Sequence, residues 1–230
     1  MSGSEGPTEP GAPTAASEAA RLVPCFEQIV AATVRLAAAE LGDAPRVLVL
    51  GVGPGVLPGR LARARPGAAF SVVDESADEL ARLAAALAGQ QVSCDTIQGP
   101  LTEPPPGPFD AAVSSLVLHR LGDDDKRLVF RRVNEALRPD GIFACAEQVA
   151  GPSLALDDLY HRSWVEQVRD AGVDDAQIDQ ALESMVYDHP ATVPDQLVWM
   201  VDAGLRDVDC FFKDYRYAVL GGWAAPSTGP

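Results

Sequence analysis

The sequence has few aromatic residues, few positive charges and no long apolar run. Aromatic residues make up 6% of the 230 residues, so a buried core must consist mainly of Ala, Val and Leu. Lys and Arg total 18 against 33 Asp and Glu, which gives a formal net charge of −15. Because nucleic-acid binding depends on neutralising phosphates with positive charge, this balance argues against DNA or RNA as a partner.

The sequence also shows little that would direct it to a membrane. No stretch approaches the ~20 apolar residues of a membrane-spanning helix, and the first residues are polar, unlike a secretory signal peptide. The four cysteines have no CxxC or other metal-ligand spacing; they are Cys25, Cys94, Cys145 and Cys210. We therefore expect a cytoplasmic protein with free thiols, no membrane partner and no metal site.

The pattern of the chain predicts one α/β domain between two tails. Residues 1–16 and 224–230 are rich in Gly, Pro and Ser and are expected to be disordered. Over 17–223, apolar runs typical of buried strands alternate with helical periodicity, which indicates a Rossmann-like, doubly wound sheet that is mostly parallel. The expected strands are 46–50, 68–74, 92–97, 109–116, 142–148 and two more within 205–220, seven in all, the last two forming an antiparallel edge hairpin.

Helices are expected between these strands and in one insertion. The expected helices are 25–42, a short one ending near 65, one capped by Ser76 with Glu79 in a capping box, 123–137 and 193–203. Residues 153–187 show two helical stretches in succession with no strand between them. We therefore expect 153–190 to be a helical lid inserted after the fifth strand.

A glycine-rich turn after the first strand is the strongest local signal. Gly51, Gly53 and Gly55 directly follow the apolar run 46–50 and precede a short helix. Glycines allow the backbone to approach a ligand closely, and the helix N-terminus offers free N–H groups. Asp74 ends the next strand, where an acid can accept the hydroxyls of a ribose. Together these features predict a nucleoside cofactor over the carboxyl ends of the strands.

The spacing of these glycines disfavours one cofactor class. In the dinucleotide fingerprint GxGxxG the third glycine would fall on Val56 or Pro58. A nicotinamide-dependent oxidoreductase is therefore a weaker alternative. The purely structural alternative is a tight turn that binds no ligand.

Residues 47–55 (VLVLGVGPG) resemble the first motif of the class I S-adenosylmethionine (SAM)-dependent methyltransferases, and further matches follow in order over about 20–223. Residues 74–76 resemble the second motif and 98–101 the third, while 109–121 (FDAAVSSLVLHRL) and 137–141 (LRPDG) resemble the motifs at strands four and five. The resemblance implies SAM as cofactor and S-adenosylhomocysteine (SAH) as product. The residues that it implies as cofactor contacts are Gly51, Gly53, Gly55, Asp74, Glu75, Gly99, Pro100, Leu101, Ser114 and Ser115.

A narrower resemblance concerns the lid. Residues 160–164 and 211–219 resemble a small bacterial subgroup that includes the carboxy-SAM synthase of tRNA wobble-uridine modification. Residues 21–26 resemble the segment that folds over the cofactor there, which adds Arg21 to the implied cofactor contacts. The synthase carries an Arg for the extra carboxylate, and no Arg occurs here between Asp174 and Pro190. Ordinary SAM chemistry is therefore favoured.

Two departures from the family pattern keep other functions open. The family commonly has acids where this chain has Val49 and Pro100, and each loss removes a polar contact to the cofactor. A SAM-using enzyme with non-methylating chemistry, or a degenerate non-catalytic partner subunit, is therefore an alternative.

His119 is the candidate catalytic residue. It follows strand four at the rim where this fold places catalytic groups, and it would act as a general base wherever the methyl acceptor is protonated. Packing against the loop is the alternative. Glu147 and Gln148 end strand five and are candidates by position. Candidate substrate contacts are Tyr160, His161, Trp164, Tyr187 and Arg216, each of which has packing or ion pairing as its alternative.

The function that these observations predict is transfer of a methyl group from SAM to O or N of a small molecule. Specialised metabolism is the expected setting. We expect a monomer or homodimer.

Overall fold

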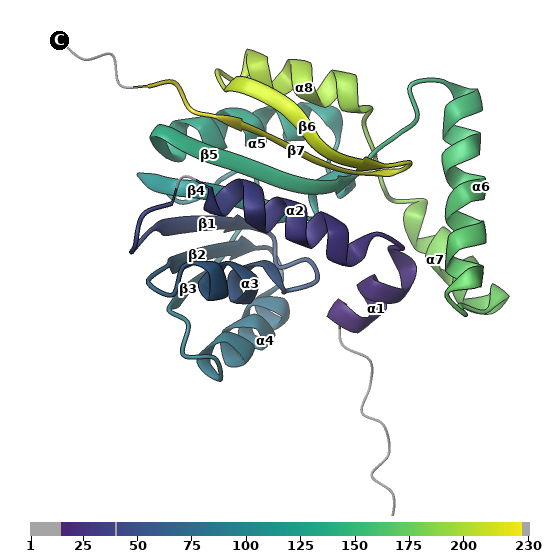
Figure 1. Ribbon diagram of the computed structural model, residues 1–230, viewed down its shortest axis with the longest axis horizontal. Coiled ribbons are helices and arrows are strands. Elements are labelled where there is room, and N and C mark those ends of the chain that lie inside the picture. Colours follow the sequence, from purple (N-terminus) through teal and green to yellow (C-terminus); the bar gives the residue numbers. More distant parts are fainter. Residues whose placement is uncertain (1–14, 40, 227–230) are drawn as a thin grey trace, which may run out of the picture.

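A seven-stranded sheet forms the centre of the molecule (Figure 1). The structure is a computed structural model and describes residues 15–39 and 41–226. The strand order is β3-β2-β1-β4-β5-β7-β6, in which β5–β7 and β7–β6 are antiparallel and the other neighbours are parallel. The strands are β1 (Arg46–Leu50), β2 (Ala69–Asp74), β3 (Cys94–Gln98), β4 (Phe109–Ser115), β5 (Leu137–Gln148), β6 (Arg206–Asp214) and β7 (Tyr217–Trp223). The predicted Rossmann-like sheet with an antiparallel edge hairpin is therefore confirmed.

Helices cover both faces of the sheet, as Figure 1 shows. Val47 and Val49 of β1 pack into one core with α2, α3 and α4, whereas Leu48 and Leu50 pack into a second core with α5 and α8. A strand that is buried on both faces needs apolar residues at every position, which explains the continuous run in β1. The helices are α1 (Ala15–Leu22), α2 (Phe26–Ala38), α3 (Leu57–Ala64), α4 (Ala77–Ala88), α5 (Asp123–Ala136), α6 (Leu154–Asp170), α7 (Asp175–Met185) and α8 (Val193–Asp202), with a short 3₁₀ helix, η1 (Leu118–Arg120).

The ends of the domain differ from the expected tails. Ala15 and Ala16 belong to α1, a helix that the sequence patterns did not predict. Ala224 is buried, and its N–H donates to the carbonyl of Gly141 at 2.8 Å. The remaining parts of the two expected tails, 1–14 and 227–230, lie outside the described residues.

Two local predictions also need correction. The expected capping box at α4 is only half formed. Ser76 accepts from the N–H of Glu79 at 3.3 Å, but its own N–H donates to Asp74, and the Glu79 carboxylate pairs with Arg82. The strand expected at 142–148 begins earlier, because β5 starts at Leu137 and its register with β4 shifts between Phe109 and Ala111.

The hairpin strand β6 forms one edge of the sheet. Its residues alternate between partly buried and exposed along the whole strand. The strand carries charges of both signs, and its register with β7 shifts at two places. The charged residues are Arg206, Asp207, Asp209, Lys213 and Asp214.

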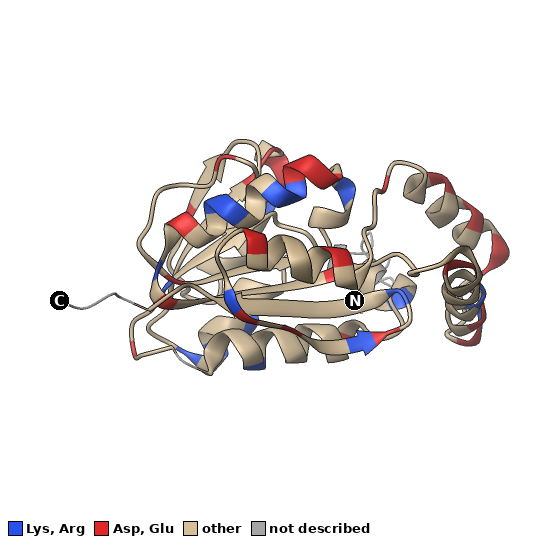
Figure 2. Ribbon diagram, turned by 90° about the horizontal axis from the view of Figure 1, so that it is seen from above, with Lys and Arg blue, Asp and Glu red and all other residues tan. Residues whose placement is uncertain are grey.

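Acidic residues prevail on α6 and α7, at the right of Figure 2, whereas α5 carries charges of both signs. In α7 the charged residues are Asp175, Asp179 and Glu183, with no Lys or Arg. No helix among the described residues is long and apolar enough to cross a membrane.

We expect the buried thiol of Cys25 to make the fold sensitive to alkaline pH. Burial, together with the nearby Asp214, raises the pKa of Cys25 from the ordinary 9.0 to about 12. Between these values the unfolded thiol has lost its proton and the folded thiol has kept it, so the unfolded state binds fewer protons and the free energy of unfolding falls as pH rises. Urea unfolding at pH 8 and pH 10.5 measures the fall. In Cys25→Ala the fall should be smaller than in the unmodified protein, and an equal fall in both would contradict the assignment.

Candidate functional site

The glycine loop between β1 and α3 is closely packed against the chain after β4. Gly51, Gly53 and Gly55 all have positive φ, at 75°, 51° and 74°, a conformation that favours glycine. A Cβ on Gly51 would lie 2.5 Å from a methyl carbon of Val117, and one on Gly53 would lie 2.2 Å from the carbonyl oxygen of Ser115. Two of these glycines are therefore required both by conformation and by space.

Asp74 holds this loop in place. One carboxylate oxygen accepts from the N–H of Val52 at 2.8 Å, and the other accepts from the N–H of Ser76 at 2.8 Å. The side chain is half-buried at the C-terminal end of β2, and each oxygen retains a lone pair for a further donor. Asp74 thus joins the glycine loop to the start of α4 and remains able to accept a hydroxyl.

The other expected cofactor residues differ in their accessibility. Glu75 and Pro100 are exposed, and the N–H of Gly99 donates to the carbonyl of Asp74 at 3.0 Å. Leu101 is buried in the core that contains α5 and α8. These four residues lie at the carboxyl ends of β2 and β3, beside Asp74.

The two serines at the end of β4 have different environments. Ser114 is fully buried, and its hydroxyl donates to the carbonyl of Leu50 at 2.9 Å, which is a bond between strands. The hydroxyl of Ser115 is buried next to the glycine loop and has no hydrogen-bond partner among the described residues. An unpaired buried hydroxyl is costly unless a ligand satisfies it, which marks Ser115 as the better candidate contact.

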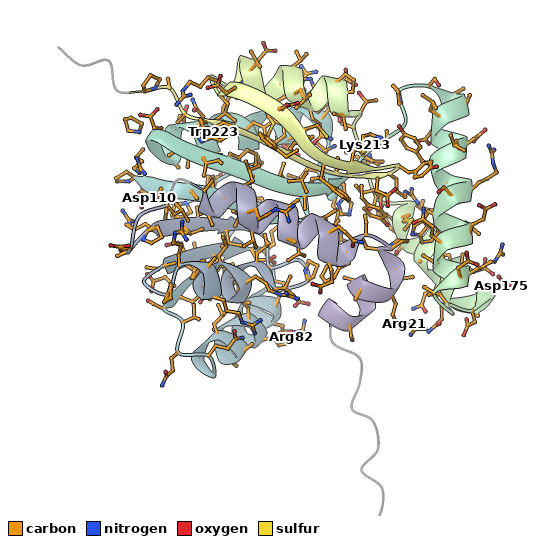
Figure 3. The ribbon with its side chains drawn as sticks, viewed as in Figure 1. Arg21, Arg82, Asp110, Asp175, Lys213 and Trp223 are labelled. Carbon is orange, nitrogen blue, oxygen red and sulfur yellow. The ribbon has the colours of Figure 1, made fainter. Side chains whose placement is uncertain are left out.

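A pocket of about 560 Å³ opens beside the glycine loop. Five segments line it: α1 with the turn after it, the glycine loop, the loop after β4, the end of β5 with the start of β7, and α7 with the residues after it. Arg21 on α1 donates to Gln177 on α7 at 2.9 Å across the pocket, and Figure 3 shows Arg21 at the same end of the molecule as Asp175 at the start of α7. The lining residues include Arg21, Gly53, Pro54, His119, Gln148, Gln177, Gln180, Ser184, Met185, Asp188 and Tyr217.

His119 faces this pocket and is held from behind by Glu147. The Glu147 carboxylate is 1% exposed and accepts from the N–H groups of Leu118 at 3.0 Å and of His119 at 2.9 Å. It also lies 3.0 Å from Nδ1 of His119. Since an ionised carboxylate can only accept, this contact assigns the proton to Nδ1. The lone pair of Nε2 is then free on the pocket side.

Asp188 approaches Nε2 of His119 from the other side. Its Oδ1 lies 3.7 Å from Nε2, and its Oδ2 accepts from Gln148 at 3.5 Å. The segment after α7 is held in position because the N–H of His189 donates to the carbonyl of His119 at 2.7 Å. The buried ammonium of Lys126 on α5 donates to the carbonyl of His189 and to Asp123.

We expect Lys126→Met to disturb this arrangement without removing any pocket residue. The substitution leaves the carbonyl of His189 without its buried donor, which costs about 1–3 kcal/mol. Thermal unfolding of the variant should therefore occur at a lower temperature than that of the unmodified protein. A Lys213→Met control removes the lysine on the exposed edge strand β6. Equal losses in the two variants would contradict the positioning role of Lys126.

The lid helices anchor α1 instead of presenting the expected aromatic contacts. Trp164 donates from Nε1 to the carbonyl of Leu22 at 2.8 Å, and the Tyr217 hydroxyl donates to the same carbonyl at 3.3 Å. Burial raises the pKa of Tyr217 well above its ordinary value, so the hydroxyl keeps its proton. Arg216 stacks over the Trp164 ring with its guanidinium carbon 5.3 Å from the centroid.

The expected substrate contacts therefore lie outside the lining of the pocket. Tyr160 accepts from Lys213 at 2.8 Å, and His161 and Tyr187 are exposed. Trp164 and Arg216 pack behind the pocket, where a guanidinium nitrogen of Arg216 is 3.7 Å from the sulfur of Met185. The polar residues that α7 and its following turn do present had no motif to identify them; they are Gln177, Gln180, Ser184 and Asp188.

Comparisons with known proteins agree with this geometry. Residues 48–143, from β1 into β5, match a family model described as a methyltransferase domain. No curated protein matches the sequence significantly.

Among the described residues, no group of three or more His, Cys, Asp or Glu side chains is placed to hold a metal ion.

Several solved structures share the fold at low sequence identity. An O-methyltransferase family protein from Burkholderia thailandensis has a TM-score of 0.62 and 17% identity, over 91% of this chain and 59% of that one. Human N-acetylserotonin methyltransferase, solved in complex with SAM, has a TM-score of 0.58 and 19% identity, over 91% and 57%. The mitomycin 7-O-methyltransferase MmcR has a TM-score of 0.59 and 18% identity, over 86% and 55%.

The chain thus spans less than two thirds of the length of each of these three proteins. The three structural matches cover 91%, 91% and 86% of this chain. The chain therefore has the fold of the class I SAM-dependent methyltransferases, and its residues 48–143 match the methyltransferase-domain model.

Proposed function

We propose that this chain transfers the methyl group of SAM to an oxygen or nitrogen atom of a small molecule. One observation carries the proposal: His119, oriented by the buried Glu147, directs a free Nε2 into the pocket that the glycine loop also lines. A base beside the cofactor loop is the arrangement that methyl transfer to a protonated acceptor requires.

The residues around the glycine loop fit SAM. Gly53 lines the pocket and admits no Cβ, Asp74 can accept ribose hydroxyls, and the Ser115 hydroxyl lacks a partner that a ligand would supply. Arg21 offers a guanidinium at the mouth of the pocket for a carboxylate. When bound, SAM supplies a methyl group on a positively charged sulfur, which a nucleophile can attack directly.

The protein's own contribution is then to orient the acceptor and move its proton. Glu147 fixes the imidazole through Nδ1, so that Nε2 receives the proton of the acceptor as the new bond forms. Positioning of this kind accounts for much of the catalysis in an in-line transfer. The volume of about 560 Å³ suits a small molecule and not a folded macromolecule.

The names of the structural neighbours support the choice of substrate class. N-acetylserotonin and mitomycin are small molecules, and the second suggests specialised metabolism as the setting. We propose a cytoplasmic monomer or homodimer that acts without nucleic acid or membrane. The acidic net charge of −15 supports the exclusion of nucleic acid.

Calorimetric titration of the purified protein with SAM, SAH and NAD⁺ tests the cofactor. We expect SAM and SAH to bind with micromolar affinity and NAD⁺ not to bind. Mass analysis of the products from labelled SAM and a panel of small acceptors tests the reaction. Absence of SAM and SAH binding would favour a degenerate partner subunit. SAM binding with a modified SAM as the product would favour the non-methylating alternative, and NAD⁺ binding would favour an oxidoreductase.

A further inference from the structure

Asp188 carries a negative charge at the pocket wall that the described residues do not neutralise. Its side chain is 11% exposed and lines the pocket. Among the described residues, its closest side-chain partners are the amide of Gln148 at 3.5 Å and Nε2 of His119 at 3.7 Å. Within the described residues, no Lys or Arg lies within 4.0 Å of its carboxylate. Both contacts are longer than strong hydrogen bonds, so the carboxylate is poorly compensated.

The nearby arginines of the described residues make no ion pair with this carboxylate. Arg216 stacks on Trp164 and contacts Met185. Arg21 donates to Gln177, and Arg120 is exposed at the mouth of the pocket. A largely buried carboxylate without a cationic partner is costly, so a cationic ligand group would be bound favourably there.

The same carboxylate disfavours an anionic acceptor. An oxygen nucleophile develops negative charge as it loses its proton to His119, and Asp188 would lie beside that charge with Glu147 just behind the imidazole. The negative charge that develops on the oxygen would be repelled by the Asp188 carboxylate, and this repulsion is strong where the dielectric constant is low. A protonated amine, by contrast, becomes neutral when it loses its proton, so no negative charge develops.

The net charge of the chain and of α7 has the same sign, although Arg21 and Arg120 also line the pocket. The charged residues of α7, which forms one wall of the pocket, are all acidic, and the whole chain has a net charge of −15. A negative field raises the local concentration of cations and lowers that of anions. The long-range electrostatics and the local contact therefore select the same kind of ligand.

On the basis of the proposed function, we infer that the methyl acceptor is an amine, bound as its ammonium ion between Asp188 and Nε2 of His119. One N–H proton of the ammonium passes to Nε2, and the resulting imidazolium lies between the carboxylates of Glu147 and Asp188. The freed nitrogen lone pair forms the N–C bond to the methyl group while the S–C bond of SAM breaks, and the sulfur keeps the electron pair. The products are SAH and the N-methylated acceptor in its protonated form.

Binding to the SAH-loaded protein tests this inference. The probes are benzylamine, phenethylamine and butylamine, each compared with the alcohol and the carboxylate of the same skeleton. We expect at least one of the amines to bind about tenfold or more tightly than its two counterparts, the size expected for a hydrogen bond to a charged group. In Asp188→Asn that preference should be lost, because the neutral amide keeps the shape and removes the charge.

Asp179→Asn is the matched control, since it removes the same charge from the exposed surface of α7 outside the pocket lining. Its preference for the amine should be that of the unmodified protein. The inference is overturned if no amine binds, if alcohols or carboxylates bind as tightly as the amines, or if the preference survives in Asp188→Asn. Failure of SAH to bind the unmodified protein is a separate result, which contradicts the proposed function itself.

Discussion

Replacing His119 by Asn is expected to lower the rate of methyl transfer by a factor of about 10²–10⁴, the usual contribution of a positioned acid–base group. The asparagine amide can still donate to Glu147 in place of Nδ1, so the buried carboxylate keeps a partner. What the variant loses is Nε2, the atom that faces the pocket. The rate of transfer from labelled SAM under saturating conditions measures the loss, and calorimetry should show an unchanged affinity for SAM.

His161→Asn is the matched control for this variant. His161 is exposed on α6 and does not line the pocket, so its substitution should leave the rate within about twofold, as is usual for surface changes. A normal rate in His119→Asn would show that His119 only packs against the loop, which is the structural alternative. A parallel loss of SAM affinity would assign His119 to the cofactor instead of the acceptor.

Gly53→Ala should abolish measurable binding of SAM. The new Cβ would lie 2.2 Å from the carbonyl oxygen of Ser115, which is backbone and cannot rotate away, and φ at this position is +51°. The loop must therefore shift away from β4, and the hydrogen bond from Val52 to Asp74 shifts with it. We also expect a loss of about 2–4 kcal/mol in the free energy of unfolding, the range of substitutions that combine strain with a clash.

Two further glycines separate the causes of this effect. Gly55 also has positive φ, at +74°, but a Cβ there would meet only side-chain carbons at 3.8 Å and beyond, so Gly55→Ala should show the cost of strain alone. Gly42 has open space around it, and Gly42→Ala should be nearly neutral. Equal SAM affinities in the Gly53 and Gly42 variants would exclude the proposed cofactor loop.

The order of strands and helices could be predicted from the sequence because the two periodicities alternate clearly. In the parallel region β1 is an apolar run that needs burial on both faces, whereas β3, at the edge of the sheet, is mostly polar and exposed. The first helix, α1, could not be predicted, because Ala15–Leu22 is a short segment whose order depends on contacts outside itself. Trp164 and Tyr217 hold the carbonyl of Leu22, and these residues are 142 and 195 positions away in the sequence.

The sequence predicted residues on the sheet side of the candidate site but not the residues on its lid side. The glycine loop and Asp74 follow strand ends, and so does His119, which makes their meeting at one edge of the sheet predictable. The residues on the lid side could not be predicted, because helical periodicity does not show which face of α7 turns toward the pocket. Aromatic residues were expected there, and Gln177, Gln180 and Ser184 line it instead. Asp188 lies after α7, where no regular pattern assigns a direction to a side chain.

The outermost strand has a consequence for the behaviour of the protein in concentrated solution. An uncovered strand edge offers unpaired N–H and C=O groups to any other chain, and this is a common start of aggregation. Three of the four exposed residues of β6 are charged (Asp207, Asp209 and Lys213), and its pairing with β7 is irregular at two places, which twists a strand out of a flat ribbon. A strand from another molecule would have to pair with the β6 backbone next to these charged side chains. The hairpin therefore supplies the last two strands of the sheet, and its charged outer edge disfavours edge-to-edge pairing between copies of the protein.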